Sequence, residues 1–127
     1  MNEKFLFGIY LLNAVILIIH EIDSAYWHEW NLFNPKDKNG INGFLIMHFP
    51  LITMILIGQI LLYENMLAGH IISFILSASG IFAFFFHFYH IRKGRPEFNT
   101  LMSKILIVST FVVSIIQMAL TINVLNI

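Results

Sequence analysis

The chain contains four apolar stretches, each long enough to cross a bilayer as a helix. They run from about Phe5 to Trp30, Ile41 to Tyr63, Met66 to His90 and Thr100 to Val124, with Pro, Gly or charged residues between them. A helix crosses the hydrocarbon core with about 20 residues and satisfies its own backbone polar groups there. The sequence therefore predicts an all-α, integral membrane four-helix bundle that forms a single domain over residues 1–127.

Composition argues against a soluble fold. Only 11% of the residues are charged, whereas soluble domains carry about 25%. Seven basic residues balance seven acidic ones, and they are scattered, so we expect no nucleic-acid partner. The lipid bilayer is the expected partner, and a homo-oligomer remains open. The first stretch resembles a secretory signal, but no clean cleavage site follows it, so we interpret it as a span.

Basic residues set the expected orientation. Six of the seven lie in or beside the first and third loops, which are on one side if the spans alternate: Lys36, Lys38, Arg92, Lys93, Arg95 and Lys104. Cytoplasmic loops carry the excess of Lys and Arg. We therefore expect this side to be cytoplasmic and both termini to face outward.

Histidines and acids gather at the same end of the predicted bundle. The stretch "IIHEIDSAYWHEW" closes the first span, and chain direction brings His48, His87 and His90 to the same side, with His70 at the opposite one. His20 lies about 22 Å along the first helix, within a hydrocarbon core about 30 Å thick. Ionisable groups at such depth face the bundle interior and pair with one another, a metal or a water path.

Imidazole and carboxylate side chains in this pattern favour a metal site. They suit zinc or iron, with copper or manganese as alternatives. The candidate ligands are His20, Glu21, His48, His87 and His90. Candidate groups that orient those ligands through hydrogen bonds are Asp23, His28, Glu29, Trp30, Asn99 and Ser103. Candidate acids and bases for a reaction are Glu21, Asp23, His28 and Glu97.

Plainer interpretations exist for parts of this pattern. Tyr26, Trp27 and Trp30 are typical of the aromatic belt at a membrane surface, with solvated acids beside them. Asn99 is suited to cap the fourth helix.

The leading functional expectation is a small metalloenzyme, a hydrolase or an oxidoreductase, that acts on a lipidic or membrane-dissolved substrate. A proton or metal-ion transporter is the first alternative. It would need polar residues across the whole membrane, and the outer halves offer few: Asn13, Gln59, His70, Gln117 and Thr121. A non-catalytic membrane subunit or effector is the second alternative.

Several short motifs together resemble a family of small bacterial membrane proteins of unknown function. They are "HEIDSAYWHEW", "HFP" in the second span, a histidine late in the third span and "EFN" before the fourth. The resemblance covers nearly the whole chain and implies the four-span fold and a bacterial inner membrane, but no reaction. The positions that carry it are His20, Glu21, Asp23, His28, Glu29, Trp30, His48, Pro50, His87, Glu97, Phe98 and Asn99. His90 is outside this set.

Overall fold

The computed structural model describes residues 2–34 and 38–125, which are helical with short connections. The helices are α1 (Asn2–Tyr26), α2 (Trp30–Phe33), α3 (Gly40–Tyr63), α4 (Leu67–Arg92) and α5 (Leu101–Leu125), and no strand occurs in these two ranges. The four long helices have the length and apolar character needed to cross a membrane. The predicted all-α membrane bundle is confirmed.

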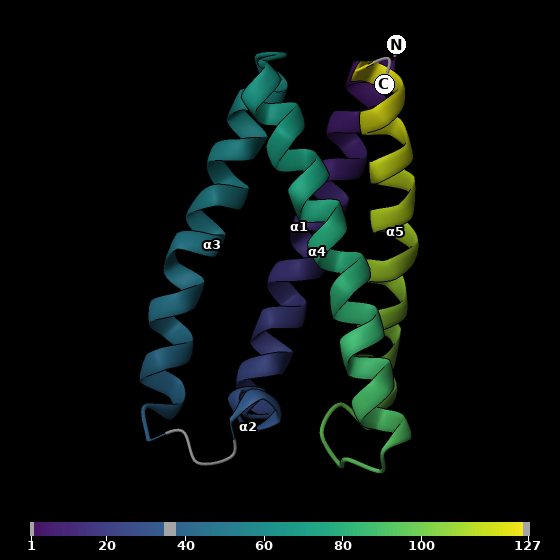
Figure 1. The fold of residues 1–127 in the computed structure, drawn as a ribbon. Coiled ribbons are helices and arrows are strands. Elements are labelled where there is room, and N and C mark those ends of the chain that lie inside the picture. The colour runs from purple at the N-terminus through teal and green to yellow at the C-terminus, as the bar shows by residue number, and fades with distance from the viewer. Residues whose placement is uncertain (1, 35–37, 126–127) are drawn as a thin grey trace.

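The four long helices form a ring in which α1 packs against α5 and α3, and α4 packs against the same two helices from the other side. Figure 1 shows that both termini lie at one end of the bundle, together with the α3–α4 turn. The short helix α2 and the α4–α5 connection lie at the other end, which we call the α2 pole. Chain direction therefore places the two loops as the sequence predicted.

Three long helices end in the same hydrogen-bonded motif, in which the residue after the last turn adopts a left-handed backbone. Gly94 ends α4 in this way with φ +79°, Asn65 ends α3 with φ 53°, and His28 ends α1 with φ 54°. At His28 the amide N–H bonds to Ala25 and the next amide, of Glu29, bonds back to Ser24 at 3.0 Å. This motif ends α1 at Tyr26, four residues earlier than predicted.

Helix α5 begins with a different cap from the one expected. The backbone N–H of Ser103 donates to Oγ1 of Thr100 at 3.1 Å. The capping side chain is therefore Thr100, one residue after Asn99. Asparagine is the stronger capping residue in general, but a threonine hydroxyl also accepts a hydrogen bond from the amide three residues on, so sequence alone favoured the wrong neighbour.

Helices α3 and α4 are closest at the tight turn that joins them. A Cβ atom on Gly69 would lie 2.3 Å from the backbone N of Leu62, so only glycine permits this approach. Towards the α2 pole, α3 leans away from α4, as Figure 1 shows. The apolar core lies in the half of the bundle that contains the α3–α4 turn, around Leu6, Tyr10 and Ile55. There the Tyr10 hydroxyl donates to the Ile55 carbonyl at 2.7 Å. The divergence leaves the α2 pole less tightly packed between α3 and α4.

Candidate functional site

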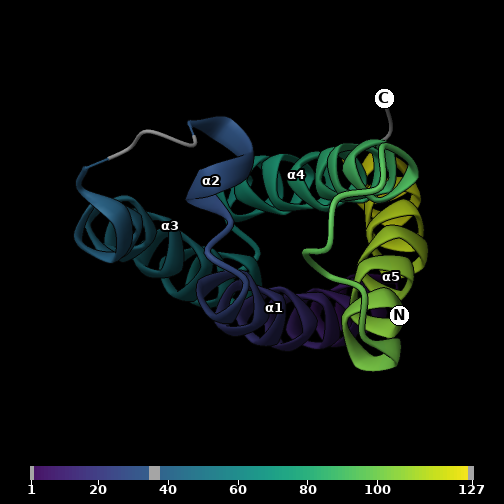
Figure 2. The same cartoon turned by 90° about the horizontal axis from the view of Figure 1, so that it is seen from below.

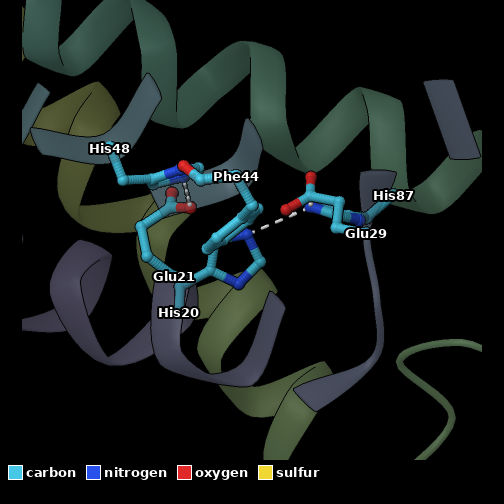
Figure 3. A network of polar contacts seen from close by, with 6 residues as sticks. All are labelled: His20, Glu21, Glu29, Phe44, His48 and His87. Atoms are coloured by element: carbon cyan, nitrogen blue, oxygen red, sulfur yellow. Dashed lines mark hydrogen bonds and ion pairs between the residues drawn. The ribbon is translucent and has the colours of Figure 1, made fainter. Parts of the chain in front are cut away.

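A pair of histidines lies at the centre of the α2 pole. The Nε2 atoms of His20 on α1 and His87 on α4 are 3.0 Å apart, and the two side chains belong to residues only 2% and 1% exposed. Figure 3 shows the two rings pointing toward each other between the helices. The Nδ1 atoms of both rings are buried without a hydrogen-bond partner. The two Nε2 atoms therefore meet at one point between the helices, where they can exchange a proton or bind a common ligand.

Phe98 covers the His20–His87 pair at the end of the bundle where the α4–α5 connection lies. It lies in the α4–α5 connection with a left-handed backbone (φ 62°), and its ring contacts His87 and His20 at centroid distances of 4.2 and 5.9 Å. A bulky residue in this conformation is strained. Because Phe98 is 1% exposed, the burial of its ring offsets that strain. The ring shields the histidine pair from the aqueous side of the pole.

Glu29 approaches the pair from the connection between α1 and α2. Its Oε1 atom lies 3.4 Å from Nε2 of His87. The motif at His28 reverses the chain and so turns Glu29 inward, while the His28 ring stacks outside on Trp30 at 4.8 Å. Burial raises the pKa of Glu29 from 4.5 to about 7, and the charges of Glu21 and Asp23 act in the same direction. Near neutral pH this carboxyl group can both hold and release a proton.

Glu21 and His48 form a second pair, which joins α1 to α3. Oε2 of Glu21 lies 2.6 Å from Nε2 of His48, and Nδ1 of His48 lies 2.7 Å from the Phe44 carbonyl. A carbonyl only accepts hydrogen bonds, so Nδ1 carries a proton and the Glu21–His48 contact holds a second one. The pair is therefore either imidazolium with carboxylate or imidazole with carboxylic acid. In both forms it stores one exchangeable proton.

A pocket of about 450 Å³ lies beside these groups, lined by residues of α1, α2, α3 and α4. His20, Glu21, Glu29, His48 and His87 contribute to its wall. The rest is largely apolar and aromatic, formed by Trp30, Phe33, Phe44, Met47, Phe82, Ala83 and Phe86 together with Asn34, Gly43 and Ser79. None of the described residues in this wall is Lys or Arg. The pocket thus combines an aromatic interior with one imidazole- and carboxylate-bearing side.

The structure brings together most, but not all, of the predicted site residues. His20, Glu21, Glu29, Trp30, His48 and His87 all line the pocket. The other predicted residues are not among its described lining residues: Asp23, His28, His90, Glu97, Asn99 and Ser103. Across residues 2–34 and 38–125, no three His, Asp or Glu side chains are arranged to hold a metal ion as they stand.

Two of those residues lie beside the imidazoles. The ring of His90 packs against Phe86 with its centroid 4.6 Å away, outside the pocket. Asp23 has a buried Oδ2 atom without a hydrogen-bond partner. Neither contributes to the wall that His20 and His87 share.

The remaining predicted residues serve the connections at the pole. Glu97 binds Arg95 through two hydrogen bonds of 2.8 and 3.1 Å. The Ser103 hydroxyl accepts a hydrogen bond from the Trp27 indole at 3.1 Å. Asn99 is exposed. These contacts order the loops next to the site.

Sequence reasoning named Asn13, Gln117 and Thr121 but missed that they belong to a column of buried polar side chains between α1, α4 and α5. Asn13 donates to Ser114 and Gln117 at 3.0 and 2.8 Å, and Gln117 donates to the Ser73 hydroxyl at 3.0 Å. Ser73 also bonds Thr121 at 2.9 Å. Ser77 and Thr110 complete the column. The signal was present in α5, where polar residues at 103, 110, 114, 117 and 121 repeat at steps that share a helix face.

The fold and the enclosed polar residues define an integral, multi-pass membrane protein with four spanning helices. Residues 6–124 match a family of unknown function, DUF6713, and the chain belongs to this family. The expected membership of a family without an assigned function is thereby confirmed, whereas the motif and the bacterial origin stay predictions. No curated protein and no solved structure matches the chain.

Proposed function

We propose that the protein binds a divalent transition metal at the α2 pole through His20, His87 and Glu29, and that it works as a small membrane metalloenzyme. The observation that carries this proposal is the convergence of two buried Nε2 atoms and a carboxylate oxygen, with separations of 3.0 and 3.4 Å. Two tetrahedral ligands at zinc bond lengths lie about 3.3 Å apart. The spacing of these atoms therefore fits neighbouring ligands of one ion.

The chemistry of the donor atoms narrows the choice of metal ion. Imidazole and carboxylate suit zinc or iron first, and copper or manganese second. Because no three His, Asp or Glu side chains of the described residues are arranged to hold an ion as they stand, binding requires these side chains to rearrange around it. Three protein ligands leave a position for water or substrate, which is the arrangement of catalytic rather than structural zinc sites. Such a bound ion activates water or polarises an oxygen of the substrate.

The Glu21–His48 pair supplies the matching proton chemistry. It lines the same pocket as the histidine pair, and its short contact holds an exchangeable proton. A group of this kind gives a proton to a leaving group or takes one from a nucleophile. The substrate enters the aromatic pocket, which suits a lipidic or membrane-dissolved molecule.

We place the α2 pole on the cytoplasmic side of a bacterial inner membrane, with both termini outside. Lys38, Arg92, Lys93, Arg95 and Lys104 support this orientation, because they all belong to the loops or helix ends of this pole, and Lys4 lies at the other end. A cysteine introduced at Lys93 or Lys4 and labelled in intact cells tests the orientation. Labelling of the Lys4 position alone by a membrane-impermeant reagent is the expected result.

Elemental mass spectrometry of the purified protein tests metal binding. We expect about one ion per chain in the wild type and at least tenfold less in His20→Ala and His87→Ala. His70→Ala is the matched control, since His70 is buried at the opposite end and bonds the Met66 carbonyl. His90→Ala tests whether His90, the second predicted ligand on α4 beside His87, contributes to metal binding. A folded wild type that binds no ion after reconstitution, or equal loss in His70→Ala, would overturn the proposal.

The buried polar column favours proton transfer across the membrane as a second candidate function. It continues polar side chains from the α2 pole toward the termini, which a transporter requires. Within the column the Thr110 hydroxyl is buried without a partner. Proton flux into liposomes that falls at least tenfold in Gln117→Leu would support this function. Equal flux in wild-type and empty liposomes would exclude it.

A further inference from the structure

The mouth of the pocket lies between α3 and α4, on the surface that faces lipid. Met47 on α3 and Phe82 on α4 both line the pocket, yet they are 70% and 63% exposed. They lie about 10 and 15 Å along their helices from the ends at the α2 pole. This depth is within the hydrocarbon core of a membrane. A ligand therefore reaches the pocket from the bilayer rather than from water.

The size and walls of the pocket restrict the body of the ligand. A volume of about 450 Å³ is at the lower end of the range for ligand pockets. Phe44, Phe82 and Phe86 form apolar walls beside the mouth. This shape suits one alkyl or aromatic body rather than a lipid with two chains.

The charges of the pocket restrict the head of the ligand. Two carboxylates, of Glu21 and Glu29, lie in the wall, and no described residue of the wall is Lys or Arg. In the metal-free protein an anionic head would meet no Lys or Arg, and the Glu21–His48 pair is neutral as a whole, so burying that charge is costly. A cationic head gains little, because Glu21 already bonds His48 and Glu29 contacts His87. Carboxylate oxygens and imidazole nitrogens are acceptors for an uncharged donor such as a hydroxyl group.

We propose that the pocket binds an uncharged, single-chain amphiphile of the fatty-alcohol class, which enters from the bilayer between α3 and α4 with its hydroxyl group toward His20 and Glu29. The proposal rests on the proposed function in that it names the substrate class of the same site. Binding itself depends on the pocket walls and is measurable without a metal.

The two tryptophans allow a sharp binding experiment, because Trp30 lines the pocket and Trp27 is not among its described lining residues. In Trp27→Phe the emission comes from Trp30, and in Trp30→Phe it comes from Trp27. The probes are a brominated fatty alcohol, fatty acid and alkylamine of equal chain length, added to metal-free protein in nanodiscs. We expect saturable quenching by the alcohol in Trp27→Phe only, with an affinity at least tenfold above that of the acid.

Substitutions in the wall provide the second measurement. Ala83→Leu fills the pocket and should weaken alcohol binding at least tenfold, whereas Ala119→Leu on the exposed face of α5 should leave it unchanged. Equal quenching of both tryptophans, tighter binding of the acid or the amine, or no effect of Ala83→Leu would overturn the proposal. If the wild type binds the alcohol but no metal, only the metalloenzyme proposal fails. If it binds metal but no alcohol, only this inference fails.

Discussion

Replacing Glu29 by glutamine should remove a pH-dependent loss of stability from the metal-free protein. Burial raises the pKa of Glu29 from 4.5 to about 7. Below pH 4.5 the group is protonated in the folded and unfolded states and contributes nothing. As the pH rises from 4.5 to 7, the unfolded state releases the proton while the folded state retains it, so the free energy of unfolding falls.

The magnitude follows from the same shift. At about 1.4 kcal/mol per pH unit, the raised pKa corresponds to a ceiling of about 3 kcal/mol. The Glu29 side chain keeps 13% of its surface exposed, and its surroundings relax on ionisation, so we expect about 1–2 kcal/mol above pH 7. Glutamine has nearly the same shape and stays uncharged, and it should avoid this cost.

Thermal unfolding in detergent with a chelator present, followed by circular dichroism between pH 4.5 and 8, measures the effect. The midpoint of Glu29→Gln should equal that of the wild type at pH 4.5 and exceed it by several degrees at pH 8. Glu64→Gln, in the exposed α3–α4 turn, is the matched control and should follow the wild type. A constant difference between Glu29→Gln and wild type at every pH would refute the reasoning.

Three further predictions concern packing. Gly69→Ala should lower the free energy of unfolding by about 2 kcal/mol or more because its Cβ would overlap the α3 backbone, whereas Gly8→Ala, with open space around it, should be neutral or stabilising in the same unfolding assay. Asn13→Leu and Gln117→Leu should each cost about 1–3 kcal/mol, and the double variant should cost less than their sum, as a double-mutant cycle reveals. Phe98→Ala should expose the histidine pair, so that diethylpyrocarbonate, followed by mass spectrometry, modifies it faster than in the wild type.

The sequence predicted the bundle well because the bilayer imposes strong constraints. A span of fixed length and apolar character is recognisable from a single chain, and chain direction then places His20, His48 and His87 at one pole. The end of α1 was predicted too late because the stop depends on a left-handed backbone at His28. Such a conformation is expected of Gly94 or Asn65 and is less common for histidine, whose ring here stacks on Trp30 two residues further along the chain.

Side-chain partners were predicted less well than positions. The sequence placed Glu21 and Glu29 near the histidines. It did not predict which carboxylate contacts which imidazole ring, since that depends on helix rotation and on the reversal of the chain after Tyr26. It also counted few polar residues in the outer halves, because it left out serine and most threonines, which are common where membrane helices pack together. Only the structure shows that Ser73 and Ser114 are buried against other polar groups.

The close approach at Gly69 makes α3 a lever pivoted at the far end of the bundle. From that pivot to the α2 pole the helix measures about 36 Å for its 24 residues. A tilt of about 5° at the turn therefore displaces the pole end by about 3 Å, roughly the width of a methyl group. Two hydrogen bonds hold α3 to α1 along this length, from Tyr10 to Ile55 near the middle and between Glu21 and His48 nearer the pole. The width of the gap between α3 and α4 at the α2 pole therefore depends on the angle between these helices at their shared turn and on the two bonds that hold α3 to α1.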